Sequence, residues 1–568
     1  MELLYIWIED YKNIKEQGFN FSSKHRFEFI PEKDKDGKIV GGKLHHEENP
    51  NHIENFFGEN ITNVTAIIGE NGAGKSSLIE YISMIYDIGG PIGINNPAFF
   101  IFMRNETIYV YSIAMEMNKL NIGFNLSLLN EHKEIGKDST YVMYSNILDG
   151  RFFNSFMTDL TTNTLIYNHN LEVFIYKQLE SYIRFLANNI YAKVPFELPN
   201  ELYIDFPKDK IIEYANSISS QNIYIEQIIK FLKSAEKTKE SSKALLKKKI
   251  ITAKILSIFH KKKDKVLVDI LSDNYEAFLE KILKKPDKLS SIDPILIEII
   301  KIIEENKDKI ESDTIIIETS KDSLRWIHNF LELIQKLSLN FNIYRIDWKT
   351  LSCGENFILN LYSRIYSLSK NINTKIIVLF LDEGELGFHP QWQKEYLKIL
   401  IDFLPQIFPD KKIQIILTSH SPFLVSDLPK ENIIFLSKNE KGECVVSKLQ
   451  DRKETFGANI HTLFTDSFFM KGGLMGTFAE KRINEVIAYL NGESIKESLF
   501  NGKTPKEQQE LAEKYISMIG EPIIRNMLQK QLNHKRLKQV ENHEDRIRKL
   551  EEELEALRKK GDYPSSSV

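Results

Sequence analysis

The strongest constraint on the fold is a glycine-rich run at residues 69–76, GENGAGKS, which matches the pattern G-x-x-x-x-G-K-[ST]. Its glycines let the backbone turn tightly and point N–H groups at phosphate oxygens. The apolar residues Val64–Ile68 before the run predict a short buried strand, and the residues from Lys75 to Tyr86 predict a helix. A strand, a glycine-rich turn and a helix in this order predict an α/β fold with a phosphate-binding loop.

Each residue type in this run has an expected role at a nucleotide. Lys75 reaches the β- and γ-phosphates, and the Ser76 hydroxyl binds Mg²⁺. The helix that follows directs the positive end of its dipole at the same anion. The predicted nucleotide-binding residues of the run are Gly69, Glu70, Asn71, Gly72, Ala73, Gly74, Lys75, Ser76 and Ser77.

A second buried strand ends in two acids. Residues 376–383 read IIVLFLDE, a continuous apolar run that is typical of a strand buried on both faces of a sheet. Ligands bind at the carboxyl ends of such strands, so Asp382 is expected to hold Mg²⁺ and Glu383 to orient and deprotonate the attacking water. Alone, this pattern also fits a strand that ends in a turn; its pairing with the phosphate loop favours catalysis.

A third buried strand, IILTSHS at residues 415–421, also ends in polar groups. His420 is expected to hydrogen-bond the γ-phosphate and so sense whether it is present, although a lone histidine after a strand is more often structural. The predicted catalytic residues are therefore Glu383, His420 and Lys75.

Together these motifs resemble those of ABC/SMC-type ATPases, in the RecF/OLD-like AAA group. The carrying segments, in the family's order, are GENGAGKS, LSCGE at 351–355, LDEGELGFHP at 381–390 and LTSHSP at 417–422. They look like the Walker A, signature, Walker B with D-loop, and switch-histidine motifs. The resemblance covers residues 1–130 and 346–440.

The resemblance implies an α/β fold, an ABC-type head with a mixed sheet and flanking helices, a long helical insertion and a helical C-terminal region. It implies ATP and Mg²⁺ as cofactors and two heads that meet head-to-tail, in a homodimer or a higher homo-oligomer. Ser352, Gly354 and Glu355 of one subunit would then contact ATP held by Lys75 of the other, until hydrolysis by Glu383 releases the pair.

The segment Tyr11-Lys12-Asn13 resembles the N-terminal Asn-Phe-Lys element of RecF- and SMC-like heads. Lys12 is therefore expected near the nucleotide; the alternative is a surface turn. The chain departs from the family at Cys353 and Gly384, and no glutamine of the Q-loop is identifiable. The insertion lacks long heptad repeats, which argues against an SMC rod.

The pattern along the chain predicts four segments. They are an N-terminal lobe at 1–130, a mostly helical insertion at 131–345, a C-terminal lobe at 346–450, and a helical region for a partner or for oligomerisation at 451–568. The polar residues 32–55, with several glycines, predict a loop. The lysine-dense stretch at 233–265 is interpreted as a solvated helix face, with a phosphate-binding surface as the alternative.

The charged helix at the C-terminus carries two heptad seams, which indicate either a short coiled coil or a helix docked on its own domain. The first seam holds Val540, Ile547 and Leu554, and the second holds His543, Leu550 and Leu557.

Composition bounds the environment. The formal net charge of −4 argues against bulk electrostatic binding to nucleic acid, although a local basic patch for nucleic acid is compatible with it. Two cysteines, no signal-peptide pattern and no apolar run long enough for a membrane span predict a reducing, cytoplasmic location without membrane partners.

The sequence argues against nuclease chemistry in this chain. No Asp-x-Asp pair follows residue 430, as a metal-dependent Toprim nuclease would need. His45, His46 and His52 fall in the predicted loop and lack the context of a His-Asn-His (HNH) nuclease.

Residues 455–483 resemble the ATPase subunit of Septu systems, a class of bacterial anti-phage defence systems. The same kind of ATPase subunit also serves in some retron systems. That resemblance implies a separate HNH-type nuclease partner. The apolar residues of this segment either pack on the head or dock that partner; they are Phe456, Ile460, Leu463, Phe464, Phe468, Phe469 and Met470.

Two functions therefore remain open. The first is a nucleotide-driven switch of anti-phage defence that regulates a nuclease. The alternative is a RecF/SMC-like DNA-repair ATPase that loads on DNA, which the lysine-dense stretch favours. A transporter subunit is disfavoured by the very long insertion.

Overall fold

The structure, a computed structural model, covers the 568-residue chain and divides it into two compact units, Met1–Phe469 and Met470–Val568. It describes all residues except 86–95, 132, 137, 153–157, 169–170, 188–193, 198–200, 219–222, 235–241, 261–273, 306–309, 312–313, 319–320, 338, 340–342, 349–350, 370, 469–472, 494–497 and 562–568.

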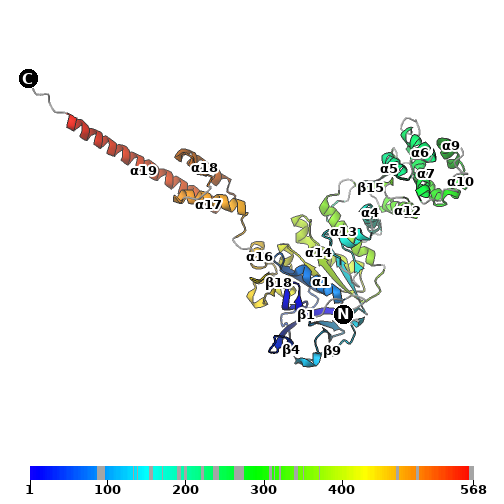
Figure 1. Cartoon of the computed structure of the whole chain (residues 1–568), viewed down its shortest axis with the longest axis horizontal. Coiled ribbons are helices and arrows are strands. Elements are labelled where there is room, and N and C mark those ends of the chain that lie inside the picture. Colours follow the sequence, from blue (N-terminus) through cyan, green and yellow to red (C-terminus); the bar gives the residue numbers. More distant parts are fainter. Residues whose placement is uncertain are drawn as a thin grey trace, which may run out of the picture. The chain divides into compact units, whose positions relative to one another are not determined.

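A large mixed sheet of 12 strands organises the first unit (Figure 1). In spatial order its strands are β11 (Thr158–Asp159), β10 (Ser139–Tyr144), β16 (Ile376–Asp382), β17 (Lys412–Thr418), β5 (Ile61–Gly69), β18 (Ile433–Lys438), β19 (Cys444–Val446), β2 (Ile14–Asn20), β1 (Glu2–Tyr11), β6 (Ala98–Arg104), β7 (Thr107–Ile113) and β9 (Ser127–Leu128).

Five neighbouring strands of this sheet, β10, β16, β17, β5 and β18, run parallel. Their side chains alternate between two cores: Ile67 faces one and Ile68 the other. Helix α1 (Lys75–Ile85) packs in the core of Ile67, whereas α13 (Cys353–Leu368) and α14 (Pro390–Ile407) pack in that of Ile68. Helices on both faces explain why these strands are apolar throughout.

The expectation of a loop at 32–55 was wrong, because β4 (Ile39–Glu48) pairs antiparallel with β3 (His25–Lys33) and parallel with β8 (Leu120–Ile122) in a second sheet. Its glycines serve close packing. A Cβ at Gly42 would lie 2.4 Å from the Phe29 ring. Glycines were therefore mistaken for turn residues where a strand needs close approach.

The segment expected as the insertion contains more than helices. Its first strands, β10 and β11, belong to the large sheet, and a four-stranded sheet combines β12 (Glu201–Asp205), β13 (Ile310–Glu311), β14 (Thr314–Glu318) and β15 (Arg345–Asp347). Its helices are α2 (Lys133–Gly136), α3 (Thr162–Tyr167), α4 (Leu171–Ala187), α5 (Lys208–Ile218), α6 (Ile223–Ser234), α7 (Ser242–His260), α9 (Tyr275–Leu283), α10 (Pro286–Ile292), α11 (Ile295–Glu305) and α12 (Lys321–Lys336). The residue boundaries of the four predicted segments stay a prediction.

Where it is described, the lysine-dense stretch is solvated at Lys233, which is exposed, but not at the lysines near the middle of α7. Lys248 and Lys249 are buried, and Lys247 forms an ion pair with Glu304. Lys261–Lys263 lie outside the described residues.

Part of the 455–483 segment packs on the head. Leu463 of α16 (Ile460–Asp466) is buried in the same core as α13 and α14, and Phe468 packs against it. Phe456 is exposed, with its ring 5.5 Å from that of Phe56. Phe469 and Met470 lie outside the described residues.

The second unit is helical and has its own small core. It contains α17 (Thr477–Asn491), α18 (Pro505–Met518) and α19 (Pro522–Gly561). The fold class is thereby confirmed: a mixed α/β sheet with flanking helices, a long insertion and a helical C-terminal region. Within the described part of the chain, no helix has the length and apolarity needed to cross a membrane.

Candidate active site

The glycine-rich run forms the turn between β5 and α1, as expected. Gly72 and Gly74 have φ angles of 74° and 109°, a region that side chains other than glycine rarely adopt. A Cβ on Gly69 would lie 2.1 Å from the Leu436 carbonyl oxygen of the neighbouring β18. Backbone geometry therefore demands glycine at all three positions.

Lys75 begins α1 and is buried. Its Nζ donates to the carbonyl oxygens of Gly69 (3.0 Å) and Glu70 (3.2 Å), so the side chain folds over its own loop. Burial lowers the pKa of Lys75, opposed by the carboxylates of Glu383 and Asp382. Glu70 and Asn71 lie in the turn, and Ala73 packs in the core beneath it; Ser76 and Ser77 occupy the first turn of α1.

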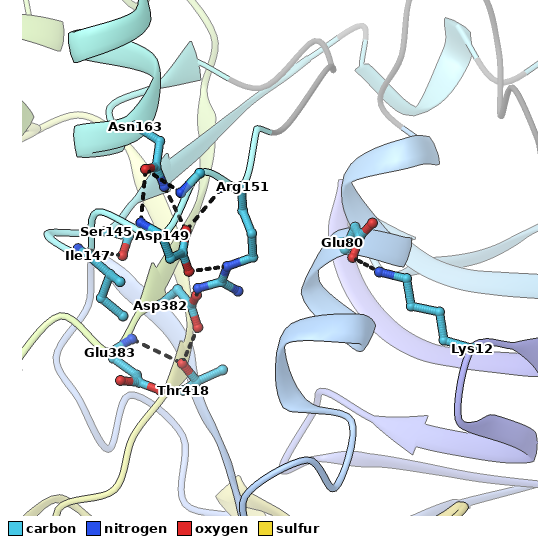
Figure 2. A network of polar contacts seen from close by, with 11 residues as sticks. Lys12, Glu80, Ser145, Ile147, Asp149, Arg151, Asn163, Asp382, Glu383 and Thr418 are labelled. Carbon is cyan, nitrogen blue, oxygen red and sulfur yellow. Dashed lines mark hydrogen bonds and ion pairs between the residues drawn. The ribbon is translucent and has the colours of Figure 1, made fainter.

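Lys12 and Asn13 are adjacent in the chain, but their side chains contact different elements: Asn13 contacts the phosphate loop, and Lys12 contacts α1. The Asn13 side chain donates to the Gly72 carbonyl oxygen at 3.0 Å and so holds the loop. Lys12 instead pairs with Glu80 on α1 (Figure 2). Within the described residues, no hydrogen bond or ion pair joins Lys12 to the loop.

The acids at the end of β16 meet the end of β17. The Thr418 hydroxyl donates to Asp382 Oδ1 (2.6 Å) and accepts from the Glu383 backbone N–H (3.0 Å). Glu383 has a φ of 49°, a strained value for a residue with a side chain. Because β5, β16 and β17 are parallel neighbours, their carboxyl ends bring the two acids and the phosphate loop to one edge of the sheet.

A basic residue that sequence reasoning missed completes this edge. Arg151 follows β10 and donates from its guanidinium to Asp382 Oδ2 at 2.8 Å. It also pairs with Asp149, whose carboxylate accepts a 2.8 Å hydrogen bond from the Asn163 side chain on α3 (Figure 2). Arg151 therefore links the Walker B aspartate to the start of the insertion.

Like Lys75, the other two catalytic candidates, Glu383 and His420, have shifted pKa values. Burial, and then the neighbouring Asp382 carboxylate, raise the pKa of Glu383. Burial, and then the positive charge of Lys75, lower the pKa of His420. His420 Nε2 lies 3.6 Å from Glu383 Oε1. A carboxylate with a raised pKa is a stronger base, which suits the extraction of a proton from water.

Glu385 supports the segment that carries His420. It is deeply buried, and its Oε1 accepts from the Ser419 hydroxyl and, at 3.4 Å, from the His420 backbone N–H. Burial raises the pKa of Glu385 to about 7. Its other oxygen, Oε2, has no hydrogen-bond partner among the described residues.

The signature residues lie at the N-terminus of α13. Ser352 and Glu355 form a capping box, in which the Ser352 hydroxyl accepts from the Glu355 N–H at 3.3 Å. A Cβ on Gly354 would lie 2.9 Å from the Trp392 ring. Within the described chain, no hydrogen bond or ion pair connects these residues to the phosphate loop.

The residues present fit a magnesium ion. Asp382 and Ser76 offer a carboxylate and a hydroxyl, the hard oxygen donors that Mg²⁺ prefers. The described residues contain no cluster of three or more acidic, histidine or cysteine side chains that could hold a metal alone. Such a site suits Mg²⁺, which commonly uses one or two protein oxygens with substrate phosphates.

Residues 52–425, more than half of the chain, match the model of the AAA ATPase domain family. The chain belongs to this family. The matched range contains the phosphate loop, the signature, the Walker B acids and His420. It therefore includes the residues at the strand ends described above.

Two curated proteins are similar to this ATPase. The Retron Vc95 probable ATPase of Vibrio cholerae serotype O1 biovar El Tor is 26% identical over 407 residues, covering 67% of this chain and 70% of that protein. The Septu protein PtuA of Bacillus mycoides (strain KBAB4) is 33% identical over 141 residues, 24% of this chain and only 18% of that protein. The expected resemblance to Septu and retron ATPases is confirmed.

A solved structure of the recombination mediator protein RecF, of the RecFOR pathway, covers 78% of this chain and 98% of its own at 11% identity and a TM-score of 0.23.

Proposed function

We propose that this AAA ATPase binds and hydrolyses ATP with Mg²⁺ and acts as the nucleotide-driven switch of a bacterial anti-phage defence system, regulating a separate HNH-type nuclease. The observation that carries the catalytic part is the Thr418 hydroxyl, which joins the Asp382 carboxylate to the Glu383 backbone at the edge where the phosphate loop ends.

In this proposal the phosphate loop binds the nucleotide. The backbone N–H groups of 69–77 and the N-terminus of α1 face the phosphates, and Lys75 exchanges its carbonyl partners for phosphate oxygens. Asp382 and Ser76 hold Mg²⁺, which when bound neutralises charge on the phosphates.

Glu383 takes the proton of the attacking water. Its raised pKa favours this role, and its backbone is held by Thr418. His420, neutral because its pKa is lowered, contacts the γ-phosphate region from β17. Hydrolysis is therefore expected to decline on acidification at a pH above the ordinary range for a carboxyl group, because protonated Glu383 cannot act as a base.

Two copies complete the site in a head-to-tail arrangement. Ser352, Gly354 and Glu355 sit at the partly exposed start of α13, where the positive end of the helix dipole suits an anion. Neither half-site neutralises a triphosphate alone, so ATP joins two heads and hydrolysis separates them.

The defence role rests on the named relatives, a retron ATPase that matches along most of both chains and a Septu protein that matches locally. The alternative, a RecF/SMC-like repair ATPase that loads on DNA, loses part of its support because Lys247, Lys248 and Lys249 are buried or paired.

The test is a pull-down of the tagged Glu383→Gln chain from its native host with ATP and Mg²⁺, compared with the Lys75→Ala chain. Glu383→Gln keeps the side-chain shape but removes the base, so it should trap the ATP-bound form. A stoichiometric nuclease that is retained differently by the two variants supports the defence switch. Recovery of DNA or replication proteins alone supports the repair function. If Glu383→Gln hydrolyses ATP at the normal rate, the base is elsewhere.

A further inference from the structure

The second unit ends in a helix that extends beyond its own core. The first part of α19 packs on the unit through Leu528 and Leu532, and Arg536 pairs with Glu513 of α18 at 2.8 Å. From Leu537 to Ala556 every residue is exposed. Figure 1 shows α19 continuing past α17 and α18. The helix docked on its own domain, one of the two alternatives, therefore describes only the first half of α19.

From Val540 onward, the exposed half keeps its large apolar residues on one stripe. Val540, Ile547 and Leu554 are spaced by seven and are 50–55% exposed, and Leu550 lies on the adjacent seam with 53% exposed. All other positions between Val540 and Leu554 are charged or polar. A helix that is otherwise so polar gains nothing from this stripe in water, whereas a paired helix would bury it.

We propose that this half of α19 pairs with the same helix of a second copy in a parallel, two-stranded coiled coil. Val540 and Ile547 are β-branched at the a position and Leu550 stands at d, the combination that favours two parallel strands. His543 at the d position forms a polar layer that sets the register. The Leu557 side chain lies outside the described residues.

The charges at the e and g positions favour a parallel orientation of the two helices. In a parallel pair Arg546 at g faces Glu551 at e of the partner helix, and the twofold axis repeats this contact, so opposite charges meet twice. In an antiparallel pair e positions face e positions and g positions face g positions, which sets Glu544 against Glu551 but also Arg546 against Glu553 of the other helix. The parallel arrangement therefore brings Arg546 and Glu551 together as opposite charges at both copies of the contact, whereas the antiparallel one combines attraction with repulsion.

This contact goes beyond the ATP-dependent pairing of heads and does not require it. A coiled coil would keep two chains together between cycles and raise the effective concentration of each head near the other. Coiled coil and heads can thus be tested separately.

The experiment is disulfide cross-linking of full-length Ile547→Cys under mild oxidation without nucleotide, with Glu552→Cys on the opposite side of the helix as the matched control. A parallel coil brings the two copies of position 547 together, so Ile547→Cys should form a covalent dimer and Glu552→Cys should not. The same cross-link should form in a Lys75→Ala background, because the coil needs no ATP.

Sedimentation velocity supplies the second measurement. The Ile547→Glu/Leu550→Glu chain, changed only at exposed positions, should sediment as a monomer without nucleotide where the wild type is a dimer. A monomeric wild type, or a dimer that survives the double substitution, overturns the proposal. So does cross-linking that appears only when Ile547→Cys is mixed with Leu550→Cys, which marks an antiparallel pair, or that disappears with Lys75→Ala.

Discussion

The guanidinium of Arg151 lies 2.8 Å from Oδ2 of Asp382, so the carboxylate expected to hold Mg²⁺ already faces a fixed positive charge. Asp382 is almost fully buried, whereas a third of the Arg151 side chain is exposed. The Asn163 side chain on α3 donates a hydrogen bond to the Asp149 carboxylate, and Asp149 in turn forms an ion pair with Arg151. The ion pair therefore couples the nucleotide edge to the residues that lead into α3.

Replacing Arg151 should change the response to magnesium. In Arg151→Ala the competing charge is gone, so the Mg²⁺ concentration that half-saturates ATP binding should fall about tenfold. Without Mg²⁺ the variant should lose about 1 kcal/mol of stability, a modest figure because solvent screens the pair. Fluorescent-ATP titrations over a range of Mg²⁺, together with thermal unfolding, measure both. Arg151→Lys keeps the charge and is the control; an unchanged Mg²⁺ dependence in Arg151→Ala would show that arginine and metal do not compete.

The phosphate loop should depend unequally on three residues near it. Lys75→Ala should abolish measurable ATP binding, because the phosphate charge loses its cation. Asn13→Ala should weaken binding about fivefold, since the loop loses one hydrogen bond of roughly 1 kcal/mol at the Gly72 carbonyl.

Lys12→Ala is the informative comparison in that series, measured by calorimetry. Because Lys12 pairs with Glu80, we expect a smaller loss of affinity than for Asn13→Ala. A loss as large as that of Lys75→Ala would mean that Lys12 contacts the nucleotide directly, as the resemblance to RecF- and SMC-like heads implies.

Two substitutions at Ser352 separate its cap from its role towards a second subunit. Aspartate is a good helix N-cap, so Ser352→Asp should keep wild-type stability, whereas Ser352→Ala should lose about 1 kcal/mol. A carboxylate facing the γ-phosphate should nevertheless prevent ATP-dependent pairing of heads. Chemical denaturation measures the first effect, and light scattering of chains that also carry Glu383→Gln measures the second. ATP-dependent pairing that persists in Ser352→Asp would place the signature away from the phosphate.

Glu385 should make stability depend on pH. Its pKa is about 7 in the fold against 4.5 as the reference, so the folded state holds a proton that the unfolded state releases. Its contribution to stability is full below about pH 4.5 and is lost as pH rises to about 7, where ionisation costs up to about 3 kcal/mol.

Glu385→Gln stays neutral and keeps an oxygen acceptor for Ser419 and His420. Its stability advantage over wild type should therefore grow between about pH 4.5 and 7 and then level off. Urea unfolding at several pH values gives the difference. An advantage that does not vary with pH would mean that Glu385 is ionised in the fold throughout this range.

Much of the nucleotide site could be predicted because its signals are local. The turn at 69–76 needs glycine because of its own backbone conformation. The unbroken apolar run at 376–382 predicts a strand that is buried on both faces. Local patterns failed where glycine served packing, at Gly41 and Gly42 of β4, and where lysines were buried, at Lys248 and Lys249.

The sequence by itself determined the fold class, the phosphate loop and the positions of the acids, because each depends on neighbouring residues along the chain. Only the tertiary structure decided that Arg151 meets Asp382, that Thr418 joins Asp382 to Glu383, and that Asn13 holds the loop. These contacts join residues that are distant in sequence, and the register of parallel strands brings them together at one sheet edge. No local pattern records that register, because it results from burying both faces of the whole sheet.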